Sequence, residues 1–295
     1  MRRAAWLLAV LLAWPVVSAA AQTAAPRVIA VDWGLAETLA AIGAPPSGLP
    51  EMAGYEAWVK TPPMPADTAE LGLRVTPSLE FLAAAKPDVI ATTSQFAAID
   101  PILSRIAPTR SLDVYTSDLT PLDHSVTAAR ALGEMTGREA AAQALIDDTD
   151  SRIAALEERL AGHETKSVLM VSFMDDRHVR VFTKGSMFDD VMARAGLSNA
   201  WTEPGNFWGF ALASIENLAR MDNIAILIVE PIPESVRVKL ADPERRSLLG
   251  QLPAFAPGNY RILPPVWQFG ALPSAGRFAD MLLDNADFLE RPDAL

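Results

Sequence analysis

The sequence predicts an α/β protein made of two similar α/β lobes with mostly parallel central sheets, joined by one long rigid helix. Apolar strand patterns alternate with helix patterns, which is typical of α/β units. The same order of elements occurs twice, and a long segment of helix-forming residues separates the two occurrences. We therefore predict an N-terminal lobe over 27–135, a connecting helix over 136–163 and a C-terminal lobe over 164–290.

The chain begins with MRRAAWLLAVLLAWPVVSAAAQ, which has the anatomy of a secretory signal peptide. Arg2 and Arg3 give a charged start, an apolar run follows, and small residues offer cleavage sites. We place the signal peptide over 1–21 and favour Sec export over twin-arginine export. The sequence contains no cysteine, which excludes disulfides and the lipid-modified Cys of a lipoprotein. We expect a mature periplasmic protein that is not a lipoprotein.

The charge of the chain is strongly acidic. The formal net charge is −11, and removal of the two signal-peptide arginines makes it more negative by two further units. Such a protein repels nucleic acid and anionic lipid as a whole, so we exclude nucleic-acid and membrane-surface partners.

The two lobes follow from repeated element patterns. RVIAVDWGLAETLAAIGA predicts a strand over 28–31 and a helix that ends near Gly43, and SVLMVSF with SMFDDVMARAGL repeats this order up to Gly196. A closer repeat joins PSLEFLAAAKPDVIA over 77–91 to ASIENLARMDNIAIL over 213–227. In each, a Ser precedes an apolar residue, a Glu, a helix pattern and a strand. Two similar lobes are the simplest consequence.

The segment TGREAAAQALIDDTDSRIAALEERLAG predicts the connecting helix, because Ala, Glu, Leu and Arg favour helix. Thr136 and Glu139 have the spacing of a capping box, and Gly162 is placed as the C-terminal cap. About 25 residues at ~1.5 Å each span ~37 Å, enough to bridge two domains as a stiff strut. The alternative is an ordinary long helix within one domain.

No motif in the sequence compels catalysis. It lacks a G-x-S-x-G elbow, a Walker loop and a G-x-G-x-x-G after a strand. His124, His163 and His178 are scattered and there is no cysteine, so we expect no catalytic residue and no zinc or copper ligated by the protein. The charged run DDRHVR over 175–180 is interpreted as a turn between strands.

Several short stretches combine aromatic, small and proline residues. They are YEAWVKTPPMP over 55–65, LGLRVTPSLEFLAAAKPDVI over 71–90, GNFWGFA over 205–211 and PPVWQFGALPSA over 264–275. Together with RIAPTR and LSNAW, they resemble the ferric hydroxamate siderophore-binding proteins of bacterial ABC importers, the ferrichrome-type periplasmic binding proteins. The resemblance covers about residue 27 to about residue 286. Its specificity comes from the ordered combination of WVKTPP, GLR, NFWG and VW-x-x-G.

The resemblance implies two lobes, one long helix and a shallow, largely preformed cleft that moves little on binding. The implied cargo is a ferric hydroxamate siderophore, whose own oxygens already wrap the iron. We therefore expect no cofactor, because iron is bound only through the siderophore, and no metal ligand from the protein. The implied partners are this complex and an inner-membrane ABC permease, and we expect a monomer.

The GLR motif implies that Arg74 donates to the partly negative oxygens of the cargo, since a guanidinium offers several N–H groups in a fixed fork. Where the family usually has a contacting Tyr, this chain has Phe96, which removes a hydroxyl and keeps a ring. Within NFWG, we expect Trp208 to face the ligand and Phe207 to pack beneath it. The remaining implied ligand contacts are Trp267, Trp58, Trp33, Asn206 and Met187.

Glu80 and Glu216 occupy equivalent places in the two lobes, each at the start of a helix pattern. The resemblance implies that an acidic residue on each lobe docks to arginines of the permease, and both positions match. The alternative is that each Glu only favours the positive N-terminal end of its helix.

Alternative functions remain open at this point. The same fold could bind cobalamin, haem or a catecholate siderophore. A catecholate complex is strongly anionic and calls for several basic residues, whereas only Arg74 is assigned, which favours hydroxamates. Alternatives from other classes are a periplasmic hydrolase, against which the missing nucleophile motif argues, and a scaffold without small-molecule affinity.

Overall fold

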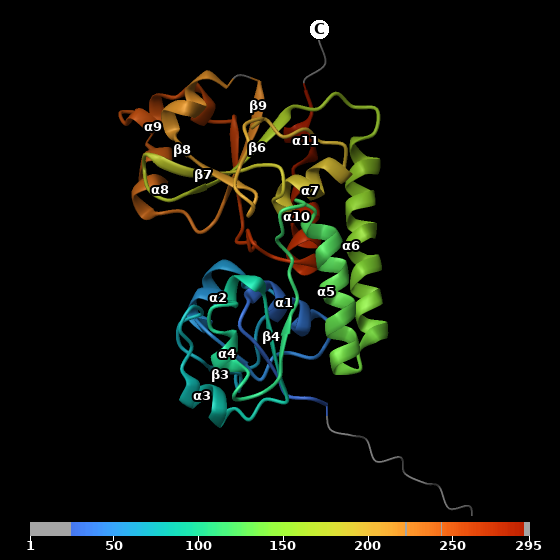
Figure 1. Ribbon diagram of the computed structural model, residues 1–295. Coiled ribbons are helices and arrows are strands. Elements are labelled where there is room, and N and C mark those ends of the chain that lie inside the picture. The colour runs from blue at the N-terminus through green and yellow to red at the C-terminus, as the bar shows by residue number, and fades with distance from the viewer. Residues whose placement is uncertain (1–24, 222, 243, 292–295) are drawn as a thin grey trace, which may run out of the picture.

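The computed structural model contains two α/β lobes, with long helices packed along one side of both (Figure 1). It describes residues 25–221, 223–242 and 244–291. The predicted signal peptide, residues 1–21, lies outside these ranges. Within the described ranges, no helix combines the length and the apolar character needed to cross a membrane. The predicted fold class is confirmed.

The N-terminal lobe is built on a parallel five-stranded sheet. Its strands are β1 (Val28–Ala30), β2 (Gly48–Leu49), β3 (Ala69–Glu70), β4 (Val89–Thr92) and β5 (Thr109–Ser111). Its helices are α1 (Trp33–Ala41), α2 (Met52–Trp58), α3 (Leu79–Ala84), η1 (Ser94–Phe96) and α4 (Asp100–Leu103). The strand order is β3-β2-β1-β4-β5, and Ile29 of β1 lies opposite Ile90 of β4. Both are fully buried, because helices and loops cover both faces of the sheet.

The C-terminal lobe has a mixed sheet. Its strands are β6 (Ser167–Phe173), β7 (His178–Phe182), β8 (Phe210–Ser214), β9 (Ile224–Val229) and β10 (Tyr260–Leu263). Its helices are α7 (Met187–Arg194), η2 (Ile215–Arg220), α8 (Glu234–Ala241), α9 (Leu248–Gln251), η3 (Pro253–Phe255), α10 (Leu272–Asp284) and α11 (Ala286–Leu289). The order is β10-β9-β6-β7-β8, with β7 antiparallel to both neighbours and the other pairs parallel.

A tight turn between β6 and β7 explains why these two strands are antiparallel. The carboxylate of Asp175 accepts from the backbone N–H groups of Arg177 and His178, at 2.8 and 2.7 Å, which reverses the chain between β6 and β7. The predicted turn is thus confirmed for the first half of DDRHVR. The second half, however, belongs to strand β7.

The predicted repeat is confirmed by matching caps. The hydroxyl of Ser78 accepts from the backbone N–H of Phe81 at the start of α3. Ser214 and Asn217 form a reciprocal capping box at the start of η2. The second copy, η2, has six residues like α3 but is a 3₁₀ helix rather than an α-helix. Each of these helices leads into a central strand, β4 or β9.

The predicted connecting helix is α6 (Glu139–Leu160), and α5 (Pro121–Thr136) runs antiparallel beside it (Figure 1). The predicted capping box is wrong, because Thr136 is the last residue of α5 and its hydroxyl donates to the carbonyl of Leu132. Arg138 occupies the N-cap of α6 without a side-chain bond. Gly162 follows the end of α6 with φ of +80°, a conformation that favours glycine.

One hydrophobic cluster passes through both lobes. It includes buried side chains of β1 and α1 in the N-terminal lobe, of α5 and α6, and of α7 and α10 in the C-terminal lobe. Moving one lobe against the other would disrupt this close-packed interior. The lobes are therefore held in a fixed relation.

A buried carboxylate also joins the lobes. Glu37 of α1 accepts from the backbone N–H of Ala271 at 2.8 Å and from the hydroxyl of Ser274 at 2.7 Å, both at the start of α10. The guanidinium of Arg277 lies 3.6 Å from the same carboxylate and donates to the carbonyl of Val59. Glu37 is fully buried, and burial raises its pKa to about 7.

Candidate functional site

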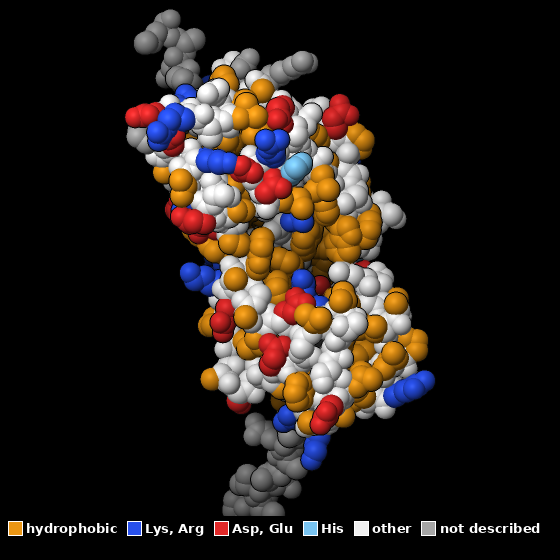
Figure 2. All heavy atoms as spheres, turned by 90° about the vertical axis from the view of Figure 1, so that its left-hand side faces the viewer, with side chains coloured by type: hydrophobic (Ala, Val, Ile, Leu, Met, Phe, Trp, Pro, Cys, Tyr) orange, Lys and Arg blue, Asp and Glu red, His pale blue; other side chains and the backbone are white. Residues whose placement is uncertain are grey.

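A cavity of about 380 Å³ lies between the two lobes. Figure 2 shows a hollow between the two lobes, surrounded by hydrophobic side chains with basic groups among them. Both lobes contribute walls, so a ligand there would touch each of them. The lining residues are Asp32, Arg74, Thr93, Ser94, Gln95, Asp113, Val114 and Tyr115 from the first half of the chain and Arg180, Phe207, Trp208, Phe210, Trp267 and Phe269 from the second half.

Arg74 is held rigidly at the N-terminal wall. Its Nε donates to Oε2 of Glu51 at 2.9 Å, and its backbone N–H donates to Oε1 of the same carboxylate at 3.2 Å. The guanidinium carbon lies 3.9 Å from the centroid of the Trp33 ring. Its two terminal nitrogens have no hydrogen-bond partner within the described residues. The prediction that Arg74 donates to a ligand oxygen fits this geometry.

The aromatic wall consists of rings that contact one another edge to face or at a tilt. Phe269 is at its centre, with its ring centroid 5.4 Å from that of Trp267 and 5.8 Å from that of Trp208. Tyr115 lies 5.8 Å from Trp208 and donates its hydroxyl to the carbonyl of Gly270. Packed rings of this kind keep the wall preformed and present an apolar surface.

The loop GNFWGF explains why aromatic residues alternate with small ones. The side-chain oxygen of Asn206 accepts from the backbone N–H groups of Trp208 and Phe210, at 3.0 and 3.3 Å, and so fixes the loop. Gly209 has φ of +73°, and a Cβ there would lie 2.0 Å from the backbone nitrogen of Ser186. Only glycine allows this close approach, which anchors the loop against the start of α7.

The structure corrects the predicted role of Phe207. Half of its side chain is exposed and it lines the cavity beside Trp208, at a centroid distance of 4.6 Å. It therefore does not pack beneath Trp208. Asn206 is exposed and organises the loop, and it is not among the residues that line the cavity.

Four other predicted ligand contacts lie behind the cavity surface. Phe96 is buried in the core of the N-terminal lobe, and the three residues before it, 93–95, line the cavity instead. Met187 is fully buried at the start of α7. Trp33 is buried beneath Arg74 and donates its ring N–H to the carbonyl of Pro50 at 3.0 Å. Trp58 is partly buried and packs against Trp267.

The sequence analysis missed most of the lining residues, among them Arg180, Phe269 and Tyr115. Arg180 stands in the run that was interpreted as a charged turn, although the alternation in HVRVF could have indicated a strand with Arg180 on one face. Phe269 lies in the quoted motif VWQFG, next to the chosen Trp267. Tyr115 follows β5, and we find no sequence signal for it.

Charged groups are unevenly distributed between the walls. Asp32 and Asp113 line the N-terminal side together with Arg74. The carboxylate of Asp32 accepts from the backbone N–H groups of Gly34 and Leu35, and burial raises its pKa. On the C-terminal side, Arg180 is the one ionisable side chain among the lining residues that the structure describes.

No cluster of three or more His, Cys, Asp or Glu residues that could hold a metal ion occurs in the described part of the chain. The arrangement of donors and rings in the cavity suits reversible capture of a ligand with an apolar organic shell and polar oxygens.

A model of the periplasmic binding protein family matches residues 28–265, which include both lobes and most of the cavity walls. The chain belongs to the periplasmic binding protein family. Members of this family are binding components of transport systems rather than enzymes. The family places the protein in the periplasm.

Several known periplasmic binding proteins are similar over most of the chain. The iron(3+)-hydroxamate-binding protein FhuD of Escherichia coli (strain K12) is 28% identical over 261 residues, 88% of this chain and 86% of that protein. The crystal structure of FhuD from Vibrio cholerae bound to Fe³⁺–Desferal is 26% identical, covers 88% of this chain and 97% of that chain, and gives a TM-score of 0.81. Staphylococcus aureus SirA complexed with staphyloferrin B shares the fold, with 19% identity over 90% and 94% of the two chains and a TM-score of 0.61.

Proposed function

We propose that this periplasmic binding protein captures an iron(III)–hydroxamate siderophore complex between its lobes and delivers it to an inner-membrane ABC permease. The observation that carries the proposal is the preformed cavity, in which a fixed guanidinium, Arg74, faces a wall of packed aromatic rings. Such a site can hold the oxygens of the complex on one side and its organic shell on the other. The iron would remain bound only through the siderophore.

Two observations favour hydroxamates among siderophores. The relatives FhuD of Escherichia coli and of Vibrio cholerae are hydroxamate-binding and Desferal-bound proteins. In addition, the carboxylates of Asp32 and Asp113 share the cavity with its two arginines, so that the site is not the strongly basic one that a catecholate complex needs. The proposal includes secretion through the signal peptide over 1–21, a mature protein without a lipid anchor, and action as a monomer.

The direct test of the proposed function is quenching of tryptophan fluorescence by ferric complexes. Trp208 and Trp267 line the cavity. Ferrichrome and ferrioxamine B are therefore expected to quench the tryptophan fluorescence of the mature protein in a saturable way. Trp208→Phe should reduce the amplitude, whereas Trp201→Phe should not, because Trp201 packs in the core of the C-terminal lobe. A response to cobalamin or ferric enterobactin alone would overturn the hydroxamate assignment and keep the fold.

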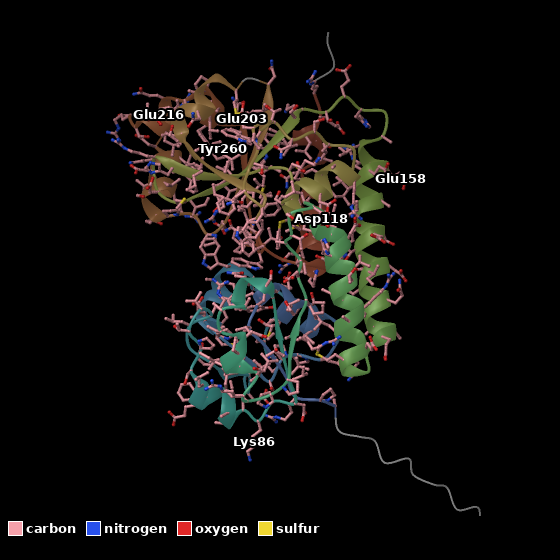
Figure 3. All side chains as sticks on the ribbon, in the orientation of Figure 1. Lys86, Asp118, Glu158, Glu203, Glu216 and Tyr260 are labelled. Carbon is pink, nitrogen blue, oxygen red and sulfur yellow. The ribbon has the colours of Figure 1, made fainter. Side chains whose placement is uncertain are left out.

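We further propose that Glu80 and Glu216 dock the protein to the permease. Both side chains are exposed, and α3 and Glu216 lie on the side of the molecule opposite α6 (Figures 1 and 3). The pKa of Glu216 is lowered because its own backbone N–H and the Ser214 hydroxyl donate to its carboxylate. Exposed carboxylates at these two positions could pair with arginines of a permease.

Reversing both charges, by Glu80→Arg with Glu216→Arg, is expected to abolish uptake of ferric hydroxamate by cells that depend on this protein. The affinity of the purified double variant for the siderophore should stay within about twofold of wild type, because neither residue lines the cavity. Glu158→Arg is the matched control, since Glu158 is exposed on the far side, on α6 (Figure 3). Normal uptake by the double variant would contradict the docking role.

A further inference from the structure

Arg180 reaches the cavity from the middle of strand β7. The side chains of Val179 and Val181 on either side of it are fully buried in the core of the C-terminal lobe. Because successive residues of a strand point to opposite faces, Arg180 projects to the other face, which forms the cavity wall. Its position is thus set by the strand and does not depend on a flexible loop.

The guanidinium of Arg180 uses few of its donors within the protein. Nη1 donates to the side-chain oxygen of Gln268 at 2.8 Å, while Nε is buried without a hydrogen-bond partner among the described residues. The guanidinium carbon lies 4.7 Å from the ring centroid of Phe210 and 5.5 Å from that of Phe269. The rings and Gln268 therefore orient a cation whose other terminal nitrogen, Nη2, has no partner among the described residues and can donate to a ligand.

The charge of Arg180 is not compensated within the described chain. Arg74 across the cavity is paired with the carboxylate of Glu51, whereas Arg180 forms no ion pair within 4.0 Å there and its one partner, Gln268, is neutral. Burial lowers the pKa of the Arg180 guanidinium, because a partly buried position disfavours the charged form. An anionic group of a ligand would offset this cost.

We propose that Arg180 binds a carboxylate on the organic arm of the cargo and gives the site a preference for ferric hydroxamates that carry such an arm. The carboxylates of Asp32 and Asp113 lie on the N-terminal side of the cavity, so an anionic arm is directed toward the C-terminal lobe. Arg74 then contacts the iron-bound oxygens, and the two arginines have separate tasks. This inference rests on the proposed function and adds the class of hydroxamate and its orientation.

If Arg180 had a purely structural role and only supported the rings of Phe210 and Phe269, its removal would change the affinity for every ligand alike. A counter-charge instead discriminates between ligands by the charge of their arm. The test therefore compares three complexes with one iron core: ferrioxamine B, whose arm ends in an ammonium group, its neutral N-acetyl derivative and its anionic N-succinyl derivative.

Titration of the wild-type protein is expected to show that the N-succinyl complex binds roughly 10-fold more tightly than ferrioxamine B. Arg180→Leu should remove this preference and change the affinity for the N-acetyl complex by less than about threefold. Gln268→Glu keeps the guanidinium in place and supplies an internal carboxylate, so it should remove the preference as well. Arg177→Leu, an exposed arginine in the turn before β7, should leave it intact.

Each outcome is informative. Equal affinity of the wild-type protein for all three complexes would overturn the role of Arg180 and leave the proposed function standing. Equal weakening of all three by Arg180→Leu, with the preference retained in Gln268→Glu, would assign Arg180 the structural role. Binding of ferrichrome but of none of the three would overturn this inference alone, whereas failure to bind ferrichrome as well would refute the proposed function and this inference with it. Thermal melting followed by circular dichroism identifies variants that do not fold. If Arg180→Leu does not fold, Gln268→Glu is the variant that tests the proposal.

Discussion

Arg74→Ala is expected to weaken the binding of ferrichrome by about 10- to 150-fold, which corresponds to the 1.5–3 kcal/mol of a hydrogen bond to a charged group. Arg74 lines the cavity on the N-terminal side, and its terminal nitrogens have no hydrogen-bond partner within the described residues. Their removal also leaves the Glu51 carboxylate without its partner, which adds repulsion toward ligand oxygens. Isothermal titration of the mature variant measures the loss.

The control for this prediction is Glu51→Gln, which keeps the guanidinium and removes the carboxylate that holds it. Because the stacking of Arg74 on Trp33 remains, the expected loss is smaller, about threefold to 10-fold. Undiminished affinity in Arg74→Ala would show that the cargo is held by the aromatic wall and not by this arginine.

Glu37 is expected to have the largest effect on stability. Glu37→Ala leaves the Ala271 N–H, the Ser274 hydroxyl and part of the Arg277 guanidinium without their acceptor in the interior, and should lower the free energy of unfolding by about 3 kcal/mol or more. Urea unfolding of the wild type and the variant measures this difference. Thr127→Ala, on the exposed side of α5, is the surface control.

The contribution of Glu37 to the free energy of unfolding is expected to depend on pH. In the native protein, burial raises its pKa to about 7 from the 4.5 of an exposed glutamate, so the folded state binds the proton more tightly. The resulting stabilisation is present at low pH and is lost as pH rises through about 7. Between pH 5 and 8, wild type should lose about 2–3 kcal/mol relative to Glu37→Gln. A parallel pH profile of the two proteins would contradict this.

Much of the fold could be predicted because local chemistry determines it. Ser78 and Ser214 cap the paired helices at the positions where the repeat placed them, and the helix-forming composition marked α6. The capping box at Thr136 failed for a physical reason. The chain reverses at Gly137, which takes the left-handed conformation, so Thr136 ends one helix instead of starting the next.

The site was harder to predict because its walls depend on which face of an element a side chain occupies. Arg74 and Trp208 lie where motifs placed them. Phe96 stands where the resemblance implies a contacting Tyr, but the one-turn helix η1 directs it into the core and leaves residues 93–95 at the cavity. Arg180 was overlooked because a charged composition suggests a solvated turn, whereas pairing with two neighbouring strands decides its direction.

The helix pair α5–α6 and the core shared between the lobes affect how empty and loaded copies of the protein compete for the permease. A molecule that does not bend on loading shows the same outline whether or not it carries cargo. Empty copies are then expected to compete with filled copies for the permease, and the rate of iron entry depends on the ratio of the two populations. An excess of unloaded protein would slow uptake rather than speed it. Discrimination between them is left to small changes at the cavity rim, where Phe207 is exposed.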